Sequence, residues 1–196
     1  DYAKQFSKNV IIIPTTIDTD EYAYIKDIQP SKNSICIGWS GSVTTIQHFE
    51  YVVNALMAIK AKYGDRVYFK VIGDGAYQNK QLEIKGHPWV KSSEINDLAE
   101  IDIGIMPLPD DEWAKGKCGL KGLQYMSLGI PTLMSPVGVN SEIIQDGING
   151  FLAATDEEWI NKISMLIESP ELRAKIGFEG RQTVLKDYSV AANKSH

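Results

Sequence analysis

Short apolar runs alternate with amphipathic segments along most of this chain of 196 residues. Brief apolar runs bounded by Gly, Pro or polar residues are typical of buried parallel strands, and apolar positions with a period of 3.6 are typical of helices. The pattern predicts strands at residues 10–13, 35–39, 67–72, 82–85, 101–106, 130–135 and 151–153. Because strands and helices alternate, we expect an α/β fold: a doubly wound, Rossmann-like parallel sheet of about six strands with helices on both faces.

The helices between these strands have start and stop signals in the sequence. Thr44 or Thr45 is expected to cap a helix that runs to about Lys62 and ends before Gly64. Ser93 is expected to cap a short helix. Further helices are predicted at residues 119–128, 140–145 and 157–168, and from residue 170 onward.

A linker separates the start of the chain from this regular alternation. Pro14 stops the first apolar run, and the polar residues 30–34 are typical of a linker. We therefore divide the chain into a linking segment, residues 1–34, and one domain, residues 35–196, which is long enough for a full core. Because the chain begins at Asp1 and not at Met, we expect it to be a fragment of a longer protein.

The composition limits the class of partner. Hydrophobic residues make up 43% and charged residues 23%, which is typical of a folded globular domain, and the net charge of -5 argues against a nucleic-acid partner. Cys36 and Cys118 form no disulfide framework, so a cytoplasmic location is expected. The histidines His48, His87 and His196 are scattered, and no metal-ligand spacing occurs. We expect neither a metal nor a cofactor.

The strongest chemical signal surrounds the helix that begins near residue 120. Lys117 precedes this helix, Gly119 and Leu120 begin it, and Lys121 and Gln124 share one of its faces. Cations at a helix start oppose the helix dipole unless an anion is bound, and the free amides there also favour an anion. The cluster therefore favours a diphosphate site, with Gln124 placed to bond ribose hydroxyls. A solvated pair of lysines is the alternative.

Two glycine loops follow earlier strands. Gly41 and Ser42 follow the strand at residues 35–39, and Gly73 and Asp74 follow the strand at residues 67–72. Small residues in such loops let a phosphate or sugar approach the backbone. The alternative is a tight turn that needs glycine for its geometry alone. Neither loop has the spacing GxGxxG, so a dinucleotide site is not supported.

Several segments together resemble one family. GIMPLPDDEW, GKCGLKGLQYMSLGIPTLMSPVGVNSEII and DGINGFLA resemble the C-terminal half of retaining glycosyltransferases of the GT-B fold, in the family 4 or group 1 class. VIIIPTTIDTDEY is similar to the segment by which such enzymes cross from the N-terminal to the C-terminal domain. The resemblance runs from about residue 10 to residue 188, and the order of the segments is more specific than any one of them.

The resemblance implies a nucleotide-sugar (donor) binding domain, one half of a GT-B fold, whose N-terminal acceptor domain lies outside this chain. By position, Gly119 and Leu120 match residues whose amides meet the diphosphate and the sugar. Trp89 and Val90 match a loop beside the nucleobase. Gly41 and Ser42 match the first glycine loop, near the phosphates. The remaining donor-binding candidates are Gly73, Asp74 and Gln124.

The sequence departs from the family pattern at two places. The family has a Glu, seven residues and a second Glu, and these positions fall on Gly116 and Gln124. The basic residues that usually meet the diphosphate are not evident in residues 40–45. We expect Lys117 and Lys121 to replace them, and to act in catalysis by stabilising the departing diphosphate.

The resemblance implies metal-independent transfer of a hexosyl group from a nucleotide-diphosphate sugar to a glycan or lipid acceptor, in polysaccharide or glycolipid assembly. The chain alone is expected to bind donor without efficient turnover. Contact with a membrane, at its inner face, is expected only through the absent half. Two alternatives stay open: a nucleotide-sugar-binding module that has lost catalysis, and a nucleotide-sugar epimerase of the GT-B plan.

Overall fold

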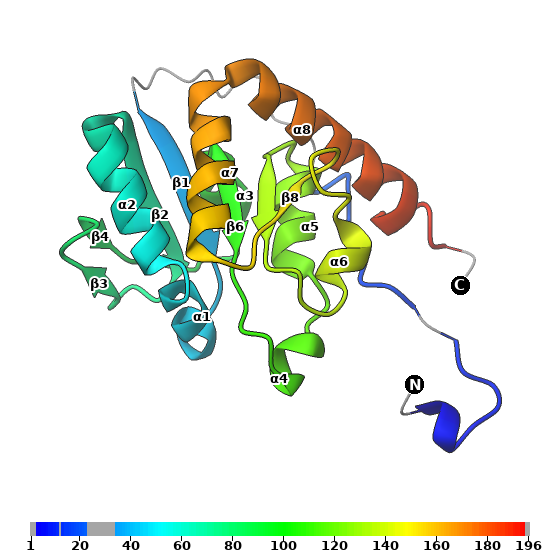
Figure 1. The fold of residues 1–196 in the computed structure, drawn as a ribbon. Helices are drawn as coiled ribbons and strands as arrows, with labels where there is room; N and C mark the ends of the chain where they lie inside the picture. The colour runs from blue at the N-terminus through cyan, green and yellow to red at the C-terminus, as the bar shows by residue number, and fades with distance from the viewer. Residues whose placement is uncertain (1–2, 12, 23–33, 195–196) are drawn as a thin grey trace.

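The computed structural model describes residues 3–11, 13–22 and 34–194 (Figure 1). Its centre is a parallel six-stranded sheet in the order β5-β2-β1-β6-β7-β8. The strands are β1 (Ile35–Ser40), β2 (Val67–Gly73), β5 (His87–Pro88), β6 (Ile103–Met106), β7 (Thr132–Met134) and β8 (Phe151–Leu152). The predicted doubly wound α/β fold is therefore confirmed.

Helices cover both faces of the sheet. One face packs against α2 (Val53–Tyr63) and α7 (Asp156–Glu168), and the other against α3 (Glu94–Ala99) and α5 (Leu120–Ser127) (Figure 1). Successive side chains of β1 alternate between these cores. Ile37 and Trp39 belong to the α2–α7 core, and Cys36 belongs to the other. This alternation follows from the two-residue period of a strand.

The C-terminal helices close the domain and hold part of the N-terminal segment. The helix α8 (Pro170–Thr183) packs on α5 and α7, and continues into a π-helical turn at Val184–Tyr188. The backbone of Ile17 bonds to Tyr188 and Val190, with N–O distances of 2.8 and 3.0 Å. Ile17 and Tyr22 are buried, so this part of the predicted linking segment contributes to the core.

The predicted strand at residues 10–13 is wrong. Residues 10, 11 and 13 have no strand pairing, and Ile12 lies outside the described residues. Ile11 and Ile13 are mostly exposed. An apolar run forms a strand only where a partner strand supplies hydrogen bonds, and no described strand is adjacent to this run.

Two further predictions need correction. The strand expected at residues 82–85 is a two-residue strand, β4 (Ile84–Lys85), which pairs antiparallel with β3 (Gln78–Asn79) outside the main sheet. The sheet edge is formed instead by β5, where Pro88 is tolerated because an edge strand needs fewer amide donors. The single helix expected from residue 44 to 62 is divided into α1 (Ile46–Glu50) and α2.

A short helix, α4 (Glu112–Lys115), lies between β6 and α5. Asp111 caps it, because its Oδ1 atom accepts a hydrogen bond from the amide of Ala114 over 2.7 Å.

Within the part of the chain that the structure describes, no helix has both the length and the apolar composition to cross a bilayer.

Candidate functional site

The carboxyl ends of β1 and β6 lie next to each other at the centre of the sheet. From β1 the chain continues to β2 on one side, and from β6 it continues to β7 on the other. The loops after the two strands therefore diverge and leave a crevice between them. In open α/β sheets, ligands bind at such a switch point.

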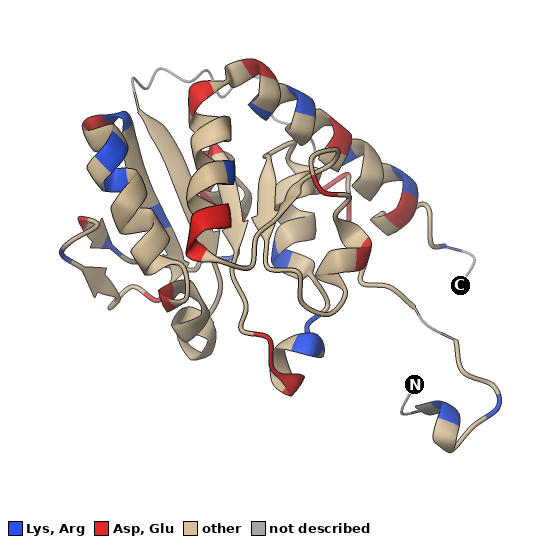
Figure 2. Cartoon of the chain, in the orientation of Figure 1, with Lys and Arg blue, Asp and Glu red and all other residues tan. Residues whose placement is uncertain are grey.

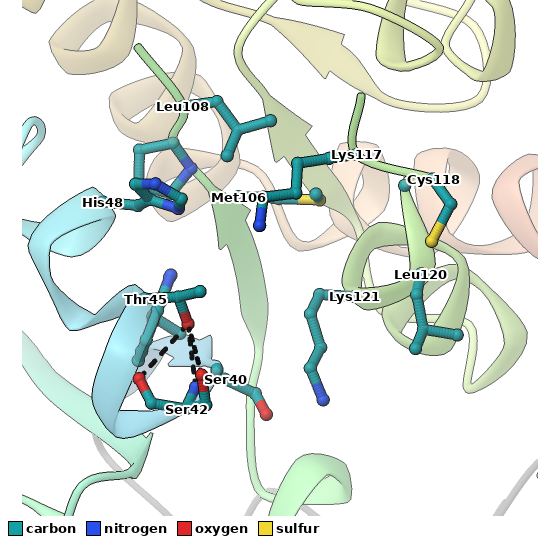
Figure 3. Close-up of a pocket in the computed structure, with 14 residues that line it drawn as sticks. Ser40, Ser42, Thr45, His48, Met106, Leu108, Lys117, Cys118, Leu120 and Lys121 are labelled. Atoms are coloured by element: carbon teal, nitrogen blue, oxygen red, sulfur yellow. Dashed lines mark hydrogen bonds between the residues drawn. The ribbon is translucent and has the colours of Figure 1, made fainter. Parts of the chain in front are cut away.

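A pocket of about 320 Å³ opens at this crevice, and we call it the switch-point pocket (Figure 3). Three segments form it: the end of β1 with the loop into α1, the residues after β6, and the turn into α5. Its lining consists of Trp39, Ser40, Gly41, Ser42, Thr45, His48, Met106, Pro107, Leu108, Lys117, Cys118, Gly119, Leu120 and Lys121. Most of the predicted diphosphate-binding residues therefore lie together.

A second pocket of about 610 Å³ adjoins the first, and we call it the tryptophan pocket. Gly41, Ser42, Leu120 and Lys121 line both pockets. Three other predicted residues, Gly73, Trp89 and Gln124, line the tryptophan pocket only. The two pockets thus form one continuous surface over the carboxyl edge of the sheet.

Two predicted site residues lie outside both linings. The carboxylate of Asp74 accepts a hydrogen bond from the amide of Ala76 over 2.8 Å, so it holds its own turn. Val90 is half-exposed next to Trp89. The structure therefore brings neither side chain into the pockets.

The loop after β1 presents hydroxyl groups to the pocket. Its first two amides are bonded within the protein: that of Gly41 to the carbonyl of Ile72 and that of Ser42 to the Thr45 hydroxyl, each over 2.9 Å. The Ser42 hydroxyl lies 2.9 Å from that of Thr44. It also lies 3.1 Å from that of Thr45 (Figure 3). The loop offers these hydroxyls to a ligand instead of the two amides.

Gly73 explains why the loops after β1 and β2 lie so close together. Its φ angle is +135°, which side chains disfavour, and a Cβ atom there would lie 2.4 Å from the carbonyl oxygen of Gly41. The second glycine loop therefore shapes the wall of the tryptophan pocket through its backbone.

The start of α5 presents free amides to the switch-point pocket. Gly119 precedes the helix with a φ angle of +72°, and a Cβ atom there would lie 2.4 Å from Cδ1 of Ile143. The amides of a first helical turn have no acceptor within the helix, and the dipole makes this end positive. Backbone donors for an anion therefore come from α5.

Two lysines flank these amides, and both point into the pocket (Figure 3). The Nζ atom of Lys117 lies 4.4 Å from the centre of the Trp113 ring, and that of Lys121 lies 3.8 Å from Oε1 of Glu94. Burial lowers the pKa of Lys121, and the charge of Glu94 partly offsets that effect. Figure 2 shows the basic start of α5 beside α4, which carries both signs of charge. A bound anion would be a further partner for both lysines.

Glu94, on α3, collects donors from three other segments. Its Oε1 atom accepts hydrogen bonds from Trp89 Nε1 over 2.9 Å and from Gln124 Nε2 over 3.2 Å. Its Oε2 atom accepts one from the Tyr22 hydroxyl over 3.0 Å, and Gln124 Nε2 also donates to that hydroxyl over 2.5 Å. The network joins the wall of the tryptophan pocket to α5 and to the N-terminal segment.

These contacts shift the pKa values of the network. Burial alone would raise the pKa of Glu94, but hydrogen bonds from Trp89 and Tyr22 and the charge of Lys121 hold it below its usual value. Burial, with the neighbouring Glu94 charge, raises the pKa of Tyr22 to about 12, although the bond from Gln124 opposes this rise. At neutral pH the carboxylate is therefore ionised and the phenol protonated.

Sequence reasoning missed several pocket residues: Tyr22, Thr45, His48 and Glu94. Glu94 had no specific signal, because a carboxylate in the first turn of a helix is favoured by the helix dipole whether or not a ligand lies near. Thr45 and His48 lie just after the first glycine loop, where the predicted helix began. Tyr22 had none, since it lies far from the site in sequence and meets Glu94 only through the fold.

Gly116 marks the first departure from the family pattern. It ends α4 as the C-cap and has no side chain to offer a ligand. Trp113 is 70% exposed on the same short helix. Among the described residues, no group of three or more His, Cys, Asp and Glu side chains is arranged to hold a metal ion.

Comparison with known proteins identifies the family. The family model described as "Glycosyl transferases group 1" matches residues 34–169, a range that contains all six strands of the main sheet and both pocket linings except Tyr22. The chain belongs to this glycosyltransferase family. The resemblance read from the sequence is thereby confirmed.

A curated relative agrees with this assignment. The glycosyltransferase 1 domain-containing protein 1 of Xenopus tropicalis is 26% identical over 136 residues, which are 69% of this chain and 38% of the relative. The chain thus spans well under half the length of that relative.

Solved structures share the fold of this group 1 domain. The C-terminal domain of the glycosyltransferase LpcC from Francisella tularensis superposes with a TM-score of 0.65 at 21% identity, over 89% of this chain and 99% of that domain. TarM from S. aureus, in a complex that includes UDP, superposes with a TM-score of 0.74 at 16% identity, over 98% of this chain and 39% of TarM. HepE from Anabaena, in complex with UDP-glucose, superposes with a TM-score of 0.70 at 17% identity, over 91% of this chain and 54% of HepE.

Proposed function

We propose that this chain is the donor-binding domain of a retaining glycosyltransferase, and that the connected pockets hold a nucleotide-diphosphate sugar. The observation that carries the proposal is the switch-point pocket, into which the start of α5, Lys117 and Lys121 all project. UDP and UDP-glucose are present in solved structures of similar fold. The proposal extends that ligand class to this chain.

The diphosphate is proposed to bind at the start of α5. The amides of Gly119 and Leu120 supply donors, the helix dipole favours the negative charge, and the side chains of Lys117 and Lys121 add positive charge. The nucleoside then extends toward Trp89 and Gln124 in the tryptophan pocket. Gly41 and Ser42 line both pockets and so would lie along the whole donor.

The proposed chemistry is positioning of the donor and stabilisation of the leaving diphosphate. As the bond between sugar and phosphate breaks, negative charge accumulates on the phosphate oxygens, and preorganised amides and lysines lower the barrier. This role needs no metal ion. We propose that a hexosyl group passes, with retention, to a glycan or lipid acceptor held by a further domain of a longer cytoplasmic protein.

A nucleotide-sugar-binding module without catalysis is the second candidate. One observation favours it: Gly116 offers no side chain where the family has a glutamate, and the second glutamate position holds Gln124. Transfer by the longer protein, assayed with radiolabelled donor, separates the two. NMR of the product's anomeric centre reports whether configuration is retained.

A thermal-shift screen tests donor binding directly. UDP, GDP and ADP, with their glucose conjugates, are added at concentrations far above the expected Kd, because a ligand of the folded state raises stability by RT ln(1 + [L]/Kd). A rise in Tm with one nucleotide supports a donor site and names the base. No rise with any of them, repeated by calorimetry, contradicts it.

A further inference from the structure

A groove with two exposed aromatic rings adjoins the switch-point pocket. It is a cavity of about 600 Å³ between α1 and α4, and we call it the aromatic groove. Trp113 is 70% exposed in it and Tyr51 is 59% exposed. The rest of its lining consists of Gln47, His48, Glu50, Pro109 and Asp111. A cavity that combines aromatic rings with a few polar side chains is typical of a small-molecule site.

His48 lines both the aromatic groove and the switch-point pocket. It is 5% exposed, and its ring makes no hydrogen bond within the described residues. The unpaired side-chain oxygens of Ser40 and Gln124 are sealed from solvent, whereas neither ring nitrogen of His48 is sealed in this way. Burial and the charge of Lys117 lower its pKa, so at neutral pH the ring is neutral and can both donate and accept. A buried imidazole that is unpaired but accessible is placed to bond a ligand.

The aromatic groove and the tryptophan pocket adjoin different ends of the switch-point pocket. The groove shares His48 with it, the tryptophan pocket shares Ser42 and Lys121, and the two outer cavities have no lining residue in common. Figure 3 shows His48 above Ser42 and Lys121. A donor with its diphosphate at the start of α5 and its nucleoside in the tryptophan pocket therefore directs its sugar toward His48. A molecule in the groove would meet that sugar.

The charges of the groove disfavour an anionic ligand. Its lining contains the carboxylates of Glu50 and Asp111 and neither lysine nor arginine. The Oε1 atom of Glu50 accepts a hydrogen bond from the Tyr77 hydroxyl over 2.6 Å, and Oδ1 of Asp111 accepts the one from Ala114. Each carboxylate keeps a second oxygen with no partner among the described residues, and such an oxygen can accept a hydrogen bond from a ligand hydroxyl.

A neutral saccharide has the chemistry that this groove offers. The C–H face of a sugar ring can pack on the negative face of an aromatic ring, such as those of Trp113 and Tyr51. Sugar hydroxyls both donate and accept, so they suit the free carboxylate oxygens, the amide of Gln47 and the neutral ring of His48. A phosphate or another acid would instead meet two like charges.

On the basis of the proposed function, we propose that the aromatic groove is a saccharide-binding subsite, which holds the neutral sugar of the acceptor that receives the hexosyl group. Trp113 and Tyr51 are its stacking surfaces, and Glu50, Asp111 and His48 bond the hydroxyls. This domain thus binds the end of the acceptor that meets the donor, and the further domain holds the rest.

Two tryptophans separate the two binding events by NMR. The indole N–H of Trp113 reports the aromatic groove, and that of Trp89 reports the tryptophan pocket. The methyl glycosides of glucose, galactose, mannose and N-acetylglucosamine are titrated into this chain without nucleotide, up to about 50 mM, which fills most of a site whose Kd is about 5 mM. We expect at least one to shift Trp113 and to leave Trp89 in place. In separate titrations, UDP, GDP or ADP should shift Trp89.

Variants locate the saccharide on the ring. Trp113→Ala should raise the Kd of that glycoside about tenfold, whereas Trp113→Phe, which keeps an aromatic face, should raise it less than about threefold. The Kd is read from the backbone amides around the groove. Phe178→Ala removes a ring that is 59% exposed on α8, and it should bind the glycoside as the wild type does. Should Trp113→Ala not fold, Tyr51→Ala makes the same test.

The outcomes distinguish this inference from the proposed function. If a nucleotide shifts Trp89 but no glycoside shifts Trp113, the inference alone is overturned. If a glycoside binds at Trp113 and no nucleotide binds, the proposed function fails while the groove stands as a saccharide site. With neither shift, both fail. An unchanged glycoside Kd in folded Trp113→Ala, or a Trp113 shift with a lysine-rich peptide and with no glycoside, also overturns the inference.

Discussion

The phenol oxygen of Tyr125, in the middle of α5, accepts a hydrogen bond from the backbone amide of Ser40 at the end of β1, over 2.6 Å. Tyr125 is fully buried, and burial raises the pKa of its hydroxyl. Because β1 ends with Ser40 and the glycine loop follows, this bond fixes the loop relative to the helix that carries the other side of the pocket. Ligand geometry therefore depends on a residue that lines neither pocket.

Removing this hydroxyl should cost stability. In Tyr125→Phe the ring still packs, but the buried amide of Ser40 has no acceptor, so we expect a loss of about 1–3 kcal/mol in the free energy of unfolding. Urea denaturation followed by circular dichroism measures it. Tyr51→Phe, at a residue that is 59% exposed, is the matched control and should change little. Equal unfolding midpoints for the two variants would contradict the structural role of this bond.

Gly119→Ala should damage both stability and ligand binding. The φ angle of +72° and the 2.4 Å approach to Ile143 mean that a methyl group forces α5 to shift at its start. We expect a loss of about 1–2 kcal/mol in stability, from strain alone, and weaker nucleotide binding. Gly64→Ala is the control: its φ is +58° with open space around it, far from the pockets. It should lose stability while nucleotide affinity stays unchanged.

Each pocket lysine should contribute to nucleotide affinity. Lys117→Ala and Lys121→Ala each remove a charge-assisted contact to the diphosphate, so we expect Kd to rise about tenfold in each and the salt dependence of binding to weaken. Calorimetry at two ionic strengths measures both effects. Lys175→Ala, an exposed lysine on α8, should behave as the wild type. Unchanged affinity in both pocket variants would remove the lysines from the site.

His48 should report the charge of the pocket. Burial lowers its pKa, the charge of Lys117 lowers it further, and Asp111 acts in the opposite direction. NMR titration should therefore show a higher pKa for His48 in Lys117→Met and a lower one in Asp111→Asn. Shifts of the same sign in both variants would contradict this electrostatic account.

The lowered pKa of His48 makes the stability of the fold depend on pH. The folded state binds the His48 proton less tightly than the unfolded state, whose histidine has a pKa near 6.5. The unfolded state thus takes up a proton first, and stability falls as pH drops from about 6.5 through the lower folded pKa. Unfolding midpoints measured between pH 7 and pH 5 should decrease less in His48→Gln than in the wild type.

Short-range patterns predicted the main sheet because its strands are buried on both faces. Residues 35–39 and 67–72 form mainly apolar runs that end before Ser40 and Gly73, and they are strands β1 and β2 with nearly those bounds. The edge strand β5 was not predictable from an apolar run. His87 and Pro88 are polar or constrained, and they join the sheet only because β2 presents free backbone groups to them.

For the site, the sequence identified the start of α5 through local chemistry. Lys117, Gly119 and Lys121 are neighbours in the chain, so their meeting at one helix end needed no tertiary information. Local reasoning also placed Gly41 and Gly73 after strands, and parallel strands bring their carboxyl ends to one edge. Whether these residues hold a donor stays a prediction.

The sequence by itself therefore determined the fold class and the segments that lie at the carboxyl edge, because these depend on periodicity and on contacts within a few residues. The family followed from the resemblance of several segments taken in order. Only the tertiary structure decided that Glu94 lies against Gln124, and that Tyr22 completes the network from 72 residues away in sequence. Such long-range pairs depend on how α3, α5 and the N-terminal segment pack on one sheet. No local pattern encodes that distance, so the orientation of the Gln124 amide emerges only from the folded molecule.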